Sequence, residues 1–268
     1  MIASARMYAW SPSLASAWRR LLEWVGTTAR VDLAVIDQSG PTSLDELWAR
    51  DDMGCVFMCG YPWALRRERP ALLASPVPSP PRYGGRAVYV TDFIVRADSP
   101  YTTLGDTFGG TIAYSAETSH SGYNAPRFHL LSHVTPGRHA FYRKVLGPYI
   151  RQRPCLDAVV AGDADVAAID GYAVDLLRRH DSGATAQIRV VETTAPAPSP
   201  PLVASAGIDA AARERLIEAL VGAHRAAEAR PLLDDVLLLR FDRVSPGDFE
   251  IFLERERAAR DAGYPKLA

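Results

Sequence analysis

The sequence predicts an α/β protein of two lobes joined by two hinge crossings. Strand-like and helix-like runs alternate along nearly the whole chain, which is typical of α/β folds with largely parallel sheets. Two proline-rich segments, residues 75–85 and 193–202, interrupt the alternation, and proline at this density favours stiff, extended connectors. We therefore expect one lobe of residues 1–94 and 202–268 and a second lobe of residues 95–201. A single doubly wound domain with proline-rich loops is the alternative.

In the first sixty residues, the spacing of apolar side chains predicts three strands and two helices. Leu14, Trp18 and Val25 recur at helical spacing, and Gly26 is expected to end that helix. Ser43 is expected to cap the second helix, and Pro62 suits the first turn of a further one. The expected strands are residues 6–10, 31–36 and 53–58, and the expected helices start at Leu14 and cover residues 43–50.

Beyond the first connector the same alternation continues. Strands are expected at residues 87–95, 111–115, 166–169 and 203–205. Two helices close the sequence, at residues 209–228 and 246–262, and both are expected to pack in the first lobe.

Length and charge limit the possible functions. The chain has 268 residues and is 48% hydrophobic, which is ample for a packed core. It carries 30 Lys and Arg against 31 Asp and Glu, a net charge of −1. Because there is no long basic run, this balance argues against a nucleic acid partner. Any anion site has to be local.

Cysteines and apolar runs bear on the compartment. Cys55, Cys59 and Cys155 are too few for a disulfide framework, and we expect them to be buried, with metal or redox use as the alternative. No run approaches the roughly 20 apolar residues of a membrane span, so we expect no membrane insertion. The opening residues lack a basic region followed by an apolar one, so we expect no export signal in this chain. It would then be cytoplasmic as encoded, or periplasmic if an export signal had been removed.

The most informative segment is residues 111–126, TIAYSAETSHSGYNAP. A strand-like run breaks into a polar loop containing Ser119, His120, Ser121 and Gly122, and a helical pattern follows. The first N–H groups of a helix have no intrahelical acceptor, and the helix dipole adds positive potential there. Small hydroxyl residues and a glycine let an oxyanion approach closely. The alternative is an ordinary serine cap before a surface helix.

A second segment, residues 157–175, reads DAVVAGDADVAAIDGYAVD. It predicts the end of a helix, a turn at Gly162, and an apolar strand that ends at Asp170. In open α/β folds, ligands bind outside the carboxyl ends of strands, so Asp170 is a candidate binding residue.

Three motifs together carry a family resemblance: GGTIAYS with SHSGYNAP, AVVAGDADVAAID, and CVFMCGYP nearer the N-terminus. With them the chain resembles the phosphonate-binding (PhnD-type) family over about residues 5–260. Members of that family are substrate-binding proteins of ABC transporters. The resemblance implies the type II periplasmic binding protein fold, a small-molecule ligand and an ABC permease as a possible partner.

The resemblance also implies roles for individual residues. Ser119, His120, Ser121 and Gly122 would hold the anionic head group of the ligand through backbone and hydroxyl donors. Many relatives carry Ser-Thr-Ser-Gly there, so His120 departs from the pattern. Its side chain either donates to the anion, with two donors when protonated, or points to solvent so that only its N–H matters.

Tyr61 and Tyr89 match positions where relatives present aromatic or hydroxyl groups to the ligand, with the core or the surface as the alternative for each. Where relatives often carry a Gly-Ser-His turn, this chain has Ile-Arg-Gln-Arg-Pro at residues 150–154. Arg151 or Arg153 would clamp a phosphate or carboxylate bidentately, and Gln152 between them is a further candidate. The alternative is a solvated basic turn.

Enzyme and metal motifs are missing from the sequence. There is no His-Glu-x-x-His pattern, nucleophile elbow, Walker loop or dinucleotide fingerprint. His129 and His133 are four residues apart, a possible metal pair, but no third ligand is evident and a helix-surface pair is favoured. We expect no cofactor, no metal and no catalytic residue.

Together these features predict a solute-binding protein that closes on a small anionic or zwitterionic ligand, such as a phosphonate, phosphate ester or related oxyanion. A cytosolic enzyme or ligand sensor that reuses the same fold is the alternative.

Overall fold

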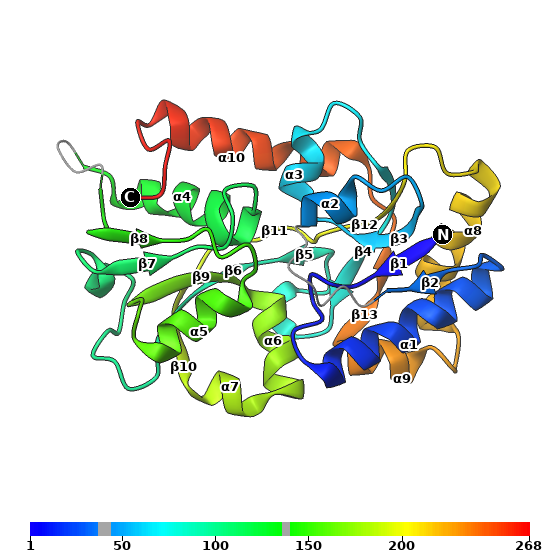
Figure 1. The fold of residues 1–268 in the computed structure, drawn as a ribbon, viewed down its shortest axis with the longest axis horizontal. Helices are drawn as coiled ribbons and strands as arrows, with labels where there is room; N and C mark the ends of the chain where they lie inside the picture. The colour runs from blue at the N-terminus through cyan, green and yellow to red at the C-terminus, as the bar shows by residue number, and fades with distance from the viewer. Residues whose placement is uncertain (37–43, 136–139) are drawn as a thin grey trace. The chain divides into compact units, whose positions relative to one another are not determined.

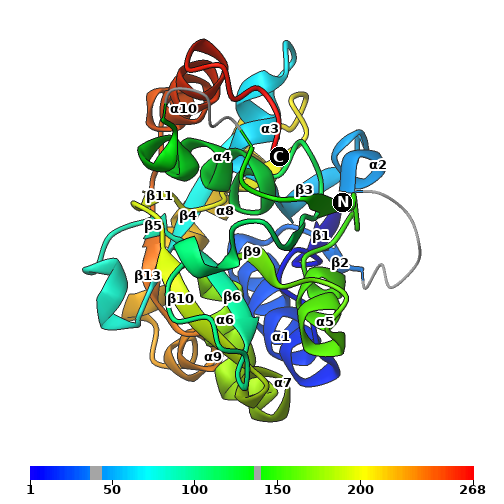
Figure 2. The same ribbon diagram turned by 90° about the vertical axis from the view of Figure 1, so that its left-hand side faces the viewer.

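The computed structural model describes residues 1–36, 44–135 and 140–268, and the expected cap Ser43 lies outside them. The chain divides into two compact units. Unit 1 comprises Met1–Val88 and Pro198–Phe249, and unit 2 comprises Tyr89–Ala197 and Glu250–Ala268. Figures 1 and 2 show the elements of each unit from two directions.

Unit 1 is built on a six-stranded sheet of order β13-β4-β12-β3-β1-β2. β1 runs parallel to β2 and β3, whereas β12 and β13 run antiparallel to their neighbours. Helices α1, α8 and α9 pack together in this unit (Figure 1). The strands are β1 Ile2–Ser4, β2 Ala34–Val35, β3 Met53–Phe57, β4 Ala71–Pro78, β12 Leu202–Ala204 and β13 Leu238–Asp242, and the helices are α1 Pro12–Ala29, α2 Leu44–Trp48, α3 Gly60–Leu65, α8 Ala210–Gly222 and α9 Arg230–Asp235.

The start of unit 1 differs from the sequence expectation. Residues 6–8 form a turn, and the first strand is β1, Ile2–Ser4. The turn forms because Tyr8 N–H donates to Ala5 O at 2.8 Å and the cap of α1 follows at once. Helix α1 also continues past Gly26 and ends at Ala29, where Arg30 takes the left-handed conformation that closes the helix.

The first proline-rich segment begins as a strand and not as a connector. β12 pairs with residues 71–74 of β4, while β13 pairs with residues 75–78. Pro76 and Pro78 therefore lie in the part of β4 that pairs with β13 on one side and with no described strand on the other. A proline without an N–H is tolerated at such a position because its missing donor costs no ladder hydrogen bond on the open side.

Unit 2 is built on a five-stranded sheet of order β10-β6-β9-β7-β8. β7 is parallel to β8 and β9, whereas β6 runs antiparallel to its two neighbours, β9 and β10. Both sheets are therefore mixed, and not largely parallel as the sequence predicted. Figure 1 shows α5 and α6 on one face of this sheet and α4 with α10 on the other. The strands are β6 Thr91–Arg96, β7 Thr111–Ala113, β8 Lys144–Leu146, β9 Val166–Asp170 and β10 Ile188–Thr193, and the helices are α4 Ala125–Leu130, α5 Arg153–Ala161, α6 Gly171–His180, α7 Ser182–Ala186 and α10 Glu250–Asp261.

Helix α10 packs in unit 2, not in the first lobe where the sequence placed it. Tyr264 and Leu267, just after the helix, belong to the same buried cluster as Phe93 and Ile112 of the unit 2 sheet. Asn124 Nδ2 also donates to Phe252 O of α10 at 3.0 Å. Burial of these apolar side chains explains the placement.

The chain consequently passes between the units three times, where the sequence predicted two crossings. The crossings fall between Val88 and Tyr89, between Ala197 and Pro198, and between Phe249 and Glu250. The first two lie in β5 (Val88–Tyr89) and β11 (Ala197–Pro198), which pair as a two-stranded sheet.

All three cysteines are buried free thiols, as the sequence predicted. Burial raises the pKa of both Cys55 and Cys155 to about 12, so these thiols stay protonated at neutral pH. None of the helices in the described ranges has the length and apolar character to cross a membrane.

Candidate functional site

The loop after β7 forms the helix start that the sequence predicted. Ser119 has extended backbone angles, and its Oγ accepts from Gly122 N–H at 3.0 Å. The helical segment opens with a π-helical turn, His120–Asn124, and continues directly into α4. The N–H groups at a helix start are the donors that an anion uses, and here Ser119 Oγ already accepts from that of Gly122.

Gly122 and Ser115 lie against each other in this loop. A Cβ on Gly122 would stand 2.2 Å from Ser115 Oγ and 3.2 Å from Ser119 Oγ, so only glycine fits. Ser115 is 2% exposed, and its hydroxyl has no hydrogen-bond partner within the described part of the chain. A buried hydroxyl without a partner is costly, and such groups in folded proteins call for an explanation. Sequence reasoning missed Ser115 because it read that residue as the end of a strand.

Gln152 joins the two motifs singled out in the sequence. Its Nε2 donates to Ser121 Oγ at 2.5 Å, and its Oε1 accepts from Asp170 N–H at 2.8 Å. Gln152 directly precedes α5, so a rigid helix start holds the amide in place. Ser121, Gln152 and Asp170 therefore form one hydrogen-bonded group.

Asp170 ends β9, as expected, and also caps the next helix. Its Oδ1 accepts from Tyr172 N–H at 2.9 Å and from Ala173 N–H at 3.2 Å, at the start of α6. This is the helix-capping geometry of an N-terminal aspartate. Asp170 thus has a structural role, and a contact with ligand would be additional to it.

Replacing Asp170 with alanine should lower the free energy of unfolding by about 1 kcal/mol, because the cap is lost. Asp170→Asn should cost less, since asparagine is an equally good cap. Urea unfolding at neutral pH measures both changes. Asp209 is the matched control: it caps α8 in unit 1 by accepting from Ala212 N–H at 2.8 Å, so Asp209→Ala should cost a similar amount. A loss above about 2 kcal/mol in Asp170→Asn would contradict capping as the main role.

His120 faces the interior of unit 2 and not solvent. It is 1% exposed, and its ring packs on Phe252 at 4.4 Å and beside Tyr89 at 6.0 Å between ring centroids. Nδ1 lies 3.2 Å from Asn124 Nδ2, and Nε2 lies 3.4 Å from Arg255 Nη1. Burial, reinforced by the charge of Arg255, holds the pKa of His120 well below 6.5. The imidazole is therefore neutral at pH 7, and the sequence alternative that it points to solvent is wrong.

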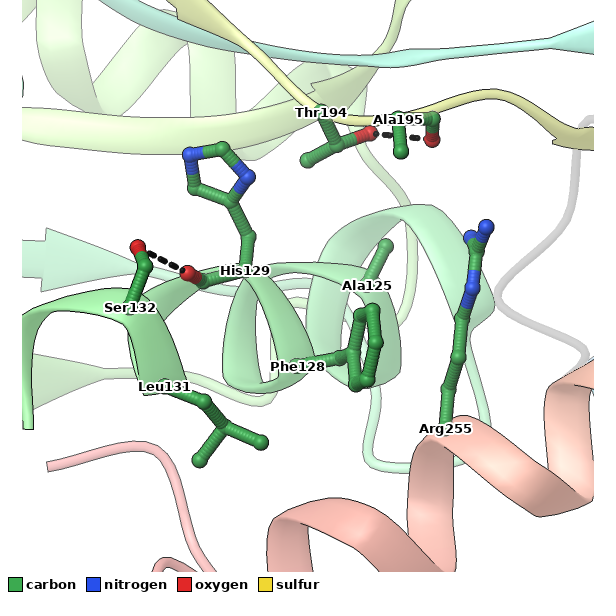
Figure 3. A pocket seen from close by; sticks show the side chains of 8 residues that line it. All are labelled: Ala125, Phe128, His129, Leu131, Ser132, Thr194, Ala195 and Arg255. Carbon is green, nitrogen blue, oxygen red and sulfur yellow. Dashed lines mark hydrogen bonds between the residues drawn. The ribbon is translucent and has the colours of Figure 1, made fainter.

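Arg255, from α10, is a buried cation that sequence reasoning missed. It is 8% exposed, and its Nη2 donates to Pro196 O at 2.7 Å. Among the described residues, no carboxylate lies within ion-pair distance of it. It lines a cavity of about 360 Å³ together with Phe128, His129 and Thr194 (Figure 3). Burial lowers the pKa of Arg255, and the guanidinium remains charged.

The remaining predicted residues are dispersed. Tyr89 is buried beside His120 in unit 2, while Tyr61 is buried in α3 of unit 1. Arg151 is exposed. Arg153 pairs with two carboxylates, of Asp157 at 2.9 Å and Asp181 at 3.2 Å, which accounts for its charge without a ligand.

The chain is similar to known proteins over nearly its full length. A family model described as "ABC transporter, phosphonate, periplasmic substrate-binding protein" matches residues 9–249. A binding protein component of an ABC phosphonate transporter from Pseudomonas aeruginosa superposes with a TM-score of 0.81 at 17% identity, covering 98% of this chain and 87% of that one. A comparison with curated proteins found no match.

Two further solved structures share the fold. PhnD1 from Prochlorococcus marinus in complex with methylphosphonate has a TM-score of 0.76 at 11% identity, with 97% of both chains covered. A protein from R. palustris with adipate has a TM-score of 0.65 at 13% identity, covering 100% of this chain and 98% of that one. The chain therefore has the type II periplasmic binding fold and belongs to the phosphonate-binding family of periplasmic substrate-binding proteins of ABC transporters.

Proposed function

We propose that this protein binds a small oxyanion, of the phosphonate or phosphate ester class, at the Ser119–Gly122 loop of unit 2 and delivers it to an ABC permease. The observation that carries the proposal is Ser115, whose buried hydroxyl lies beside Gly122 without a hydrogen-bond partner among the described residues. A ligand oxygen would satisfy that hydroxyl.

The hydrogen bonds of the loop favour an acceptor-rich ligand. Ser119 Oγ accepts from Gly122 N–H, and Ser121 Oγ accepts from Gln152 Nε2. Each hydroxyl has thereby filled an acceptor role inside the protein, so its proton can be donated outward. Ser115 Oγ and Ser119 Oγ both lie within 3.2 Å of one point, the position of a Cβ on Gly122. Hydroxyls that converge in this way suit the several oxygens of a phosphonate or phosphate ester.

Measuring the binding of a panel of candidate ligands decides which class of oxyanion the protein binds. The structural relatives were solved with methylphosphonate in one case and with adipate in another, so the panel must include both a phosphonate and a dicarboxylate. An amine-bearing phosphonate and its amine-free analogue test whether Asp170 recognises a zwitterion. The sequence predicts that the two lobes close on the ligand, and this closure is part of the same proposal.

Ligand-induced thermal stabilisation, followed by calorimetric titration, tests the proposal. We expect phosphonates or phosphate esters to stabilise the wild type. Ser121→Ala and Ser115→Ala should each weaken the affinity by about 10- to 100-fold, since a hydrogen bond to a charged group contributes about 1.5–3 kcal/mol.

Ser205→Ala is the matched control, because that serine donates to Met53 O in unit 1 and should leave the affinity unchanged. Stabilisation by dicarboxylates alone would move the ligand class to carboxylates. A lack of stabilisation by every member of the panel would overturn the assignment.

A further inference from the structure

Three potential metal ligands meet in unit 2, outside the Ser119–Gly122 loop. They are His129 of α4, His133 of the 3-10 turn Leu131–His133, and Glu192 of β10. One ligand atom from each lies within 4.8 Å of the other two. The sequence showed the histidine pair but not the carboxylate, which is about sixty residues further along the chain.

A β-bulge brings Glu192 to the histidines. β10 pairs with β6 so that Val190 opposes Ile94 and Glu192 opposes Phe93, with Val191 as the extra residue. Paired residues place their side chains on the same face of a sheet. Phe93 packs on His129 with ring centroids 5.4 Å apart, so Glu192 faces the same helix. Without the bulge, Glu192 would move to the opposite face.

The histidine rings are held before any ion arrives. His133 packs edge-on against Phe108 at 5.2 Å, and His129 contacts Phe93. His129 Nε2 and Glu192 Oε1 are 2.5 Å apart, with side chains 20% and 32% exposed. The group is therefore ordered by packing and still reachable by an ion and by water. Figure 3 shows His129 projecting from α4 among the residues that line the 360 Å³ cavity.

We propose that His129, His133 and Glu192 bind a divalent transition metal of the zinc class. Two imidazoles and one carboxylate are a donor set that zinc uses with water in the fourth position. At metal–ligand distances of about 2.0–2.1 Å, tetrahedral ligand atoms stand about 3.3 Å apart. The 4.8 Å limit on the present separations leaves only small side-chain movements, and the His129–Glu192 hydrogen bond has to lengthen when the ion enters.

The ion would tie two parts of unit 2 together. β10 leads toward the second crossing of the chain, and α4 continues the helical segment that begins in the Ser119–Gly122 loop. A metal at this point therefore braces the anchoring helix of the proposed anion site against the sheet.

The test uses the full chain without an affinity tag, stripped of metal with a chelator and returned to chelator-free buffer. Calorimetric titration with zinc chloride should give one ion per chain with a dissociation constant of about 10 μM or tighter. Co²⁺ should give the visible absorption of a tetrahedral site. Glu192→Gln keeps the shape of the side chain and should weaken zinc binding at least tenfold, and His133→Ala should weaken it further.

His224→Ala is the control, because His224 lies in unit 1 and its Nδ1 is 3.0 Å from Val221 O. It should bind zinc as the wild type does. Thermal midpoints in the presence of chelator establish that each variant folds. The proposal is overturned if 100 μM zinc does not bind, or if Glu192→Gln binds as tightly as the wild type. Equal loss in all variants, including His224→Ala, would show adventitious binding and overturn it as well. None of these outcomes depends on oxyanion binding.

Discussion

Gly122→Ala is expected to abolish ligand-induced stabilisation and to destabilise the protein by about 1–3 kcal/mol. The new Cβ would stand 2.2 Å from Ser115 Oγ, a distance at which one of the two groups has to move. Any such shift moves the N–H groups and hydroxyls of the proposed anion site away from the positions in which they would bind the ligand. The measurements are urea unfolding and titration with the ligand identified by the panel.

Two companion variants separate the clash from the general effect of alanine. Gly222→Ala adds a Cβ to helix α8 where, apart from the adjacent residues and the helix's own backbone, no atom of the described residues lies within 4 Å, so it should be neutral or slightly stabilising. The double variant Gly122→Ala/Ser115→Ala removes the clashing oxygen and should regain most of the lost stability, as contacting residues couple in a double-mutant cycle. Ligand binding should stay weak in the double variant because the Ser115 hydroxyl is gone. Additive stability losses in the cycle would contradict the clash.

Local signals were sufficient for much of the fold. β3, α8 and the helix after Ser119 follow apolar spacing and capping residues that act within a few positions. The motif resemblance to the phosphonate-binding family is confirmed by the family match over residues 9–249. Gly26 misled the prediction because a helix ends where its packing and capping end, and here that is Arg30.

The parts that escaped prediction depend on contacts distant in sequence. Arg255 reaches His120 across 135 positions, and no local pattern marks such a pair. Glu192 faces the histidines only because of a bulge, which alternation of polar and apolar residues does not reveal. The packing of α10 in unit 2 depends on the hydrogen bond from Asn124 to Phe252, 128 positions apart, and on Tyr264 and Leu267, which lie beyond the helix itself. Ser115 gains its significance from the missing side chain of Gly122.

His120 should make the protein less stable as the pH falls below about 6.5. The folded state holds this imidazole neutral, with a pKa well below 6.5, because the ring is buried and Arg255 stands against Nε2. Asn124, Phe252 and Tyr89 also contact the ring, and none of these three supplies a negative charge at this pH. An unfolded histidine takes up a proton near pH 6.5, so below that pH the unfolded chain binds more protons than the folded one.

The sign and size of the effect follow from this difference. The contribution is fully present above pH 6.5 and is lost as the pH falls toward the lower pKa of the folded state, at up to about 1.4 kcal/mol per pH unit. Urea unfolding between pH 8 and pH 5 measures the slope for the wild type and for His120→Gln, which cannot take up the proton. The free energy of unfolding of the variant should change less steeply with pH, by an amount that corresponds to the uptake of up to one proton. His224→Gln controls for the loss of a histidine elsewhere. If His120→Gln kept the slope of the wild type, the imidazole would have to take up its proton at the same pH in the folded and the unfolded protein. A protonated ring could not lie 3.4 Å from Arg255 Nη1 without a counter-ion.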